Sequence, residues 1–202
     1  MNDLEKTIIK SMRNGNRVRV QLPKNNEHLL YLHRLILVTG RSDVMYCNAF
    51  LDEAIQLLIN SIFLYEDGLF DCAFYSVRQA GEVVDSMLYL SKNDSNALKQ
   101  WSDKKYFPMD SNIKSQLEKL SEDYQEIKSL IPELFEQHTE LIKKSHKIIH
   151  KQGFDTFYRN RIQDKRGFSR KEETKLFTDS LEYTIGIILI IFILIEPLSQ
   201  AL

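Results

Sequence analysis

The chain has 202 residues, of which 43% are hydrophobic and 27% charged, a composition that excludes wholesale disorder and allows a single buried core. Its formal net charge of −1 excludes a global attraction to nucleic acid or membranes. With only 7 Gly and 4 Pro, the sequence favours long helices over a turn-rich β fold. We expect an all-α helical bundle.

The first 44 residues carry mixed signals. Leu4, Ile8 and Met12 have the spacing of a short helix. Residues 17–22 alternate polar and apolar side chains, the period of a strand, so a short β element is compatible with this segment. We interpret residues 1–44 as an N-terminal appendage and residues 45–202 as the helical bundle.

Two amphipathic helices follow, over about residues 44–66 and 69–91, with Asp67 and Gly68 between them. Because the turn is so short, the two helices must form a long antiparallel hairpin. Cys47 and Cys72 fall far apart in this pairing. We therefore expect both to be small core thiols rather than a disulfide.

A polar connection then carries the only tryptophan, Trp101, which we expect to pack onto the bundle. From Ile113 to Ile148 the chain follows an unbroken 4-3-4-3 seam spacing. The spacing continues across Pro132, a residue that breaks helices, so we expect either a kink or two nearly collinear helices. His138 lies on this seam and is interpreted as an interior histidine with a hydrogen-bond partner.

The last helix is expected over residues 170–195, because Ser169 and Glu172 form a capping box before an apolar run. The thirteen residues from Tyr183 to Ile195 fall short of the ~20 that span a membrane. A buried helix is therefore favoured over a membrane anchor. The N-terminus lacks the apolar stretch of a secretory signal, so we expect a cytoplasmic protein with no membrane partner.

The densest group of chemistry-bearing residues lies near the end of the seam. Four residues share one helical face there: Lys143, His146, Lys147 and His150. Neighbouring lysines keep a histidine neutral at pH 7, so it can act as a general base while a cation holds a phosphate. The alternative is a solvated basic face, which the dipole at a helix C-terminus favours.

His146 and His150 also have the spacing of two zinc ligands on a helix. Lys147 takes the place of the catalytic glutamate of that motif, and its charge repels a metal. No third ligand is evident. We therefore expect no metal and no other cofactor.

A basic segment with interleaved aromatic residues follows. Aromatic faces stack on bases and cations contact phosphates, so this composition suits single-stranded RNA. The alternative is a loop that packs its aromatic residues on the core and turns its charges to water. The candidate RNA-binding residues are Lys143, Lys147, Lys151, Arg159, Arg161, Lys165 and Arg166.

The chain resembles HEPN domains, all-α bundles of prokaryotic toxin–antitoxin and phage-defence systems. The resemblance rests on the Gly68 turn, the sequence Ala-Phe-Tyr-Ser-Val-Arg-Gln-Ala-Gly-Glu that ends at Glu82, and a late histidine. The stretch from Lys144 to His150 takes the place of the family's motif, an arginine and a histidine four to six residues apart. Lysine replaces the arginine here, and it offers no bidentate fork to a phosphate.

The resemblance implies a homodimer in which paired motifs cleave RNA without a metal. His150 would assist attack by the ribose 2′-hydroxyl, while Lys144 and His146 would stabilise the phosphate. We therefore expect a HEPN-like protein of bacterial stress or phage defence that binds RNA, with an antitoxin or other protein as a further partner. The alternative is a catalytically inactive dimeric interaction module built on the 113–148 seam.

Overall fold

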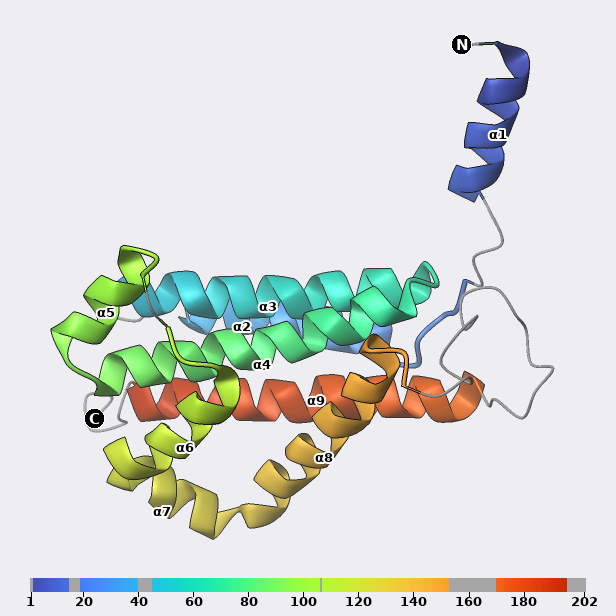
Figure 1. Cartoon of the computed structure of the whole chain (residues 1–202). Coiled ribbons are helices and arrows are strands. Elements are labelled where there is room, and N and C mark those ends of the chain that lie inside the picture. Colours follow the sequence, from blue (N-terminus) through green and yellow to red (C-terminus); the bar gives the residue numbers. More distant parts are fainter. Residues whose placement is uncertain (1, 15–18, 40–44, 106, 153–169, 196–202) are drawn as a thin grey trace.

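The computed structural model describes residues 2–14, 19–39, 45–105, 107–152 and 170–195. Within these ranges the chain is an all-α bundle of nine helices without strands, as the sequence predicts. Figure 1 shows the long hairpin of α3 (Met45–Glu66) and α4 (Phe70–Lys92) lying antiparallel above α9 (Arg170–Ile195).

The hairpin turns at Gly68. Its backbone has φ 77°, a left-handed conformation that glycine adopts without a steric cost. Gly68 N donates to the Tyr65 carbonyl at 3.0 Å and Leu69 N to the Leu64 carbonyl at 2.8 Å, the pair of bonds that closes a Schellman motif. The chain therefore turns at Asp67 and Gly68, as the sequence predicts.

The core of the bundle lies where α9 packs beneath the hairpin. The ring of Phe177 stacks on Tyr65 with centroids 4.2 Å apart, and both side chains are fully buried. Phe74 meets Phe177 edge to face at 5.6 Å. These contacts join α3, α4 and α9, so the last helix is part of the core.

Most residues of the predicted seam pack inward, except Leu120 and Ile131, but the seam is not one continuous helix. Three helices carry it, α6 (Asp110–Leu120), α7 (Glu122–Leu130) and α8 (Pro132–Ile149), and they change direction between one another in Figure 1. Ser121 Oγ accepts from Tyr124 N at 3.2 Å and caps α7. Pro132 is the first residue of α8, a position that needs no N–H donor. The expectation of one kinked helix, or of two collinear ones, is wrong.

Trp101 packs as expected. It belongs to α5 (Ser95–Ser102), the helix between α4 and α6, and its ring lies 5.0 Å from that of Phe50 on α3. This contact places α5 at the end of the hairpin opposite the Gly68 turn (Figure 1).

The N-terminal segment contributes two helices. Figure 1 shows α1 (Asp3–Asn14) standing apart from the bundle, whereas α2 (Asn25–Thr39) packs against α3 with Leu32 fully buried. Residues 19–22 form no strand, and residues 17–18 lie outside the described part of the chain. Val20 N instead donates to the Glu66 carbonyl at 3.0 Å, which ties this extended segment to the end of α3. The boundary at residues 44 and 45 stays a prediction.

No disulfide joins the two cysteines, as expected, but only Cys47 is buried. Cys72 is exposed on α4 because its neighbours Ala73 and Phe74 take the inward-facing positions. The expectation of a core thiol at Cys72 is therefore wrong.

Two segments of the described chain are long and apolar enough to cross a membrane, Cys47–Glu66 and Lys171–Ile195. The core helix of a soluble protein passes the same test of length and composition. Both segments contribute fully buried side chains to the bundle. A cytoplasmic location stays a prediction.

Candidate functional site

The basic face at the end of α8 lines a pocket that α4 closes from the other side. The pocket has a volume of about 530 Å³. Lys143, Lys144, His146 and Lys147 border it from α8, and Arg78, Gly81 and Glu82 border it from α4. The face that the sequence left as either solvated or functional is therefore the wall of a cavity.

Arg78 and Glu82 form an ion pair on the α4 wall. Arg78 Nε donates to Glu82 Oε1 at 2.6 Å, and both side chains are about three-quarters buried. Such a pair at i and i+4 stabilises the helix on which both residues lie. The pair also faces the α8 cluster, because both residues act electrostatically on His146.

Cations outnumber carboxylates around the pocket. The three lining carboxylates each have a cationic partner: Glu82 pairs with Arg78, Asp110 with Lys114 at 3.0 Å, and Glu140 with Lys143 at 2.8 Å. Lys144 and Lys147 make no ion pair within the described residues. Two ammonium groups at the rim therefore remain available to an anion.

His146 lies in the pocket wall, with His150 beside it. The two ring centroids are 4.1 Å apart. Burial lowers the pKa of His146 below its ordinary value, as do the Arg78 guanidinium and His150, while Glu82 acts in the opposite direction. A neutral imidazole at pH 7 can accept a proton. His150 caps the C-terminal end of α8 and is exposed, outside the pocket lining.

His138 forms the inner part of the pocket and is an interior histidine, as expected. A Cβ placed on Gly81 would lie 3.7 Å from its Cε1, so the ring packs directly on α4. Its Nε2 lies 3.2 Å from Thr184 Oγ1, whose proton goes to the Ser180 carbonyl, so Nε2 is the donor. Burial, together with Lys114, lowers the pKa of His138 to about 4.

A buried charged group lies behind the pocket. Lys114 of α6 contacts Asp85 of α4 at 3.3 Å and Asp110 at 3.0 Å. The Asp85 side chain is almost fully buried in this ion pair, whereas that of Lys114 is 39% exposed. Burial outweighs Lys114 and raises the pKa of Asp85 to about 6. Burial acts to lower the pKa of Lys114, but the two aspartates raise it overall.

The remaining predicted site residues do not join this pocket. Lys151 forms an ion pair with Asp71 of α4, which turns it away from the α8 face. Four candidate RNA-binding residues lie outside the described part of the chain: Arg159, Arg161, Lys165 and Arg166. The structure brings together Lys143, Lys144, His146 and Lys147, with His150 at their edge.

Sequence reasoning missed Arg78 as a site residue. The available signal was the Arg-x-x-x-Glu spacing on the helix that follows the turn. Arg78 supplies a guanidinium, the group that Lys144 lacks for bidentate contact with a phosphate.

No three His, Cys, Asp or Glu side chains of the described residues converge in the manner of metal ligands. The donor set of the pocket is cationic and favours an anionic ligand. Comparisons of the chain with protein-family models, curated proteins and solved structures find no match. The HEPN resemblance therefore stays a prediction from the sequence.

Proposed function

We propose that the pocket between α4 and α8 binds the phosphate backbone of RNA and that the protein is a metal-independent endoribonuclease of the HEPN-like type. The observation that carries this proposal is that Lys144 and Lys147, which make no ion pair among the described residues, border the same pocket as His146, a histidine of lowered pKa. A cation pair fixes a phosphate, and a neutral imidazole beside it can activate a hydroxyl.

In this reaction the ribose 2′-oxygen attacks the adjacent phosphorus and the bond from phosphorus to the 5′-oxygen breaks. The products are a 2′,3′-cyclic phosphate and a free 5′-hydroxyl. His146 takes the proton from the 2′-hydroxyl, because it lines the pocket and its pKa is lowered. This exchanges the roles expected from the sequence, in which His150 is the base and His146 a phosphate ligand.

The leaving 5′-oxygen needs a proton from the opposite side of the phosphorus. His146 and His150 are in ring contact, so they share one side of a bound phosphate. The acid is therefore supplied by a second copy of the chain across a dimer axis. This agrees with the homodimer that the HEPN resemblance implies. We propose, on that resemblance, that the protein acts in bacterial stress or phage defence in the cytoplasm.

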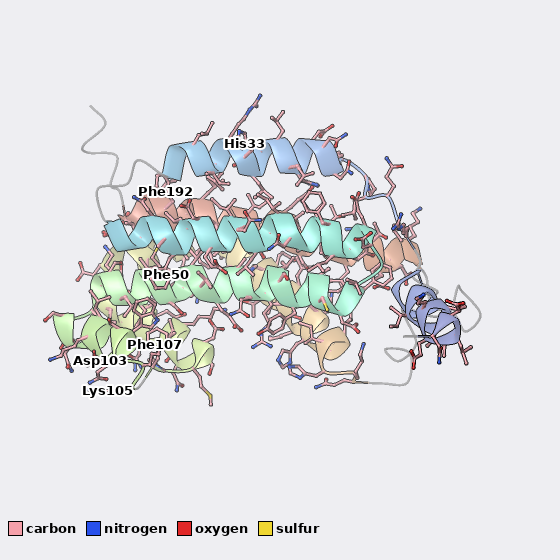
Figure 2. The ribbon with its side chains drawn as sticks, turned by 90° about the horizontal axis from the view of Figure 1, so that it is seen from above. His33, Phe50, Asp103, Lys105, Phe107 and Phe192 are labelled. Carbon is pink, nitrogen blue, oxygen red and sulfur yellow. The ribbon has the colours of Figure 1, made fainter. Side chains whose placement is uncertain are left out.

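The proposal is tested with purified protein and labelled single-stranded RNA in the presence of a chelator. We expect cleavage that leaves cyclic-phosphate ends. The cleavage rate should fall at least a hundredfold in His146→Ala and substantially in His150→Ala. His33→Ala is the matched control, because His33 is exposed on α2, across the hairpin from α8 (Figure 2).

Intact RNA after prolonged incubation, together with wild-type RNA affinity in Lys147→Ala, would remove this proposal. RNA binding that depends on Lys147, without any cleavage, would show that the protein binds RNA but is not a nuclease. Activity that stays proportional to protein concentration, even at concentrations where the protein is monomeric, would contradict an active site shared between two copies of the chain.

A second candidate, the inactive dimeric interaction module, has one observation in its favour. Leu120, Leu130 and Ile131 around α7 are exposed by 42%, 70% and 39%. Leu120 and Ile131 are seam positions, whereas Ile113 and Leu117 pack inward, so this surface includes only part of the seam. Leu130→Glu should dissociate a dimer formed through α7, while His146→Ala should leave it intact, as measured by sedimentation.

A further inference from the structure

A second pocket adjoins the first on the side of α5. It has a volume of about 500 Å³, within the range of about 300–1,000 Å³ that is usual for small-molecule sites. Trp101, Phe50, Phe107 and Pro108 give it aromatic and apolar walls. Figure 2 shows Phe107 toward the edge of the molecule opposite His33, with Phe50 between the two.

The two pockets share part of their walls. Glu82 and Asp110 line both of them. A ligand with an anionic group among the lysines of α8 can therefore extend an adjoining flat, apolar group into the aromatic pocket. A nucleotide has this construction, with a planar base joined through ribose to a phosphate.

The polar groups of the aromatic pocket are mainly hydrogen-bond acceptors. Glu53, Glu82 and Asp110 contribute carboxylates to its lining. Asp110 Oδ2 contacts Lys114, but Asp110 Oδ1 is buried and has no hydrogen-bond partner among the described residues. An unused carboxylate oxygen favours a ligand that presents N–H donors, since leaving a buried acceptor unpaired is unfavourable.

We propose that this pocket binds the nucleobase of the RNA next to the phosphate and prefers a base with an exocyclic amino group. The inference rests on the proposed function for its RNA substrate. Trp101 and Phe50 provide faces for stacking, which accepts any base, and Asp110 distinguishes an amino group from a carbonyl. Cytosine and uracil differ at this group while having the same size.

Trp101 is the only tryptophan of the chain, so its fluorescence reports on this pocket alone. Full-length protein is titrated with cytidine monophosphate, uridine monophosphate and ribose phosphate. We expect both nucleotides to quench Trp101, the cytidine nucleotide to bind about tenfold more tightly, and ribose phosphate to leave the emission unchanged. Asp110→Asn should abolish the preference for cytidine over uridine.

Ala49→Phe tests the site without disturbing the core. Ala49 is exposed on α3 and lines the pocket, so a larger side chain fills it from the outside. We expect at least tenfold weaker binding of cytidine monophosphate in this variant. Asn60→Phe, at another exposed position of α3, is the matched control and should bind as the wild type does.

Equal responses to ribose phosphate and to the nucleotides, or unchanged nucleotide binding in Ala49→Phe, would overturn the inference. A cytidine preference that survives in Asp110→Asn would overturn the role of Asp110. Quenching by cytidine monophosphate together with unaltered RNA affinity in Lys147→Ala would support the base site while the proposed phosphate site fails. Failure of the two proposals can thus be told apart.

Discussion

The imidazole rings of His146 and His150 lie 4.1 Å apart at the C-terminal end of α8, and Arg78 of α4 lines the same pocket as His146. Burial, and then the Arg78 guanidinium and His150, disfavour a positive charge on His146, while Glu82 favours one. The net result is a lowered pKa at His146. This side chain therefore has the properties of a general base in a cationic pocket.

The first prediction concerns this pKa. Arg78→Gln should raise the pKa of His146, because the guanidinium is one of the groups that lower it. The pKa can be followed by NMR of the imidazole resonances. Arg34→Gln, an exposed position on α2, is the control and should leave the pKa of His146 where it is. A shift of the same size in both variants would contradict the proximity of Arg78 to this ring.

The second prediction concerns the pH dependence of stability. Burial raises the pKa of Asp85 from 3.8 to about 6, so between these values the folded state holds a proton that the unfolded chain has released. Its contribution to stability therefore grows as the pH falls through that window. His138 acts oppositely. Its pKa is lowered from 6.5 to about 4, and its contribution is lost as the pH falls through that range.

Asp85→Asn should remove only the first of these effects. The difference in the free energy of unfolding, wild type minus variant, should rise by about 2–3 kcal/mol when the pH is lowered from 7 to 4. Urea denaturation at the two pH values measures this difference. Asp52→Asn, at an exposed position of α3, should show no comparable change. A difference that stays constant with pH would mean that Asp85 titrates normally.

The third prediction concerns the place of α9. Phe177→Ala should lower the free energy of unfolding by about 3–5 kcal/mol, because it removes a fully buried ring stacked on Tyr65. Phe63→Ala removes a ring that is 51% exposed and should cost much less. Equal effects in denaturant titrations would show that α9 does not pack on the hairpin and would favour its use as a membrane anchor.

The sequence predicts the hairpin and α9 well because their signals are local. A glycine turn between two amphipathic stretches defines α3 and α4, and the apolar run defines α9. The seam shows the limit of periodicity. Most of its inward positions are correct, although Leu120 and Ile131 are exposed. The breaks at Ser121 and Ile131 come from backbone geometry at a cap and before a proline, which preserve the spacing of apolar residues.

The site was predictable only on its α8 side. Lys143, His146 and Lys147 share a face through helical spacing alone. Arg78 and Lys114 come from other helices, and their positions depend on how α4, α6 and α8 pack. The packing of α4 against α8 also brings Lys151 to Asp71, so Lys151 does not belong to the basic face of α8. One-dimensional spacing carries no information on these tertiary contacts.

The most direct measurement for the pocket is the salt dependence of its RNA affinity. Binding of single-stranded RNA should weaken linearly in a plot of log affinity against log salt, and Lys147→Ala should reduce the magnitude of the slope by about 0.7. Arg34→Ala on α2 should keep the wild-type slope. The same slope in Lys147→Ala as in the wild type would contradict phosphate binding between α4 and α8.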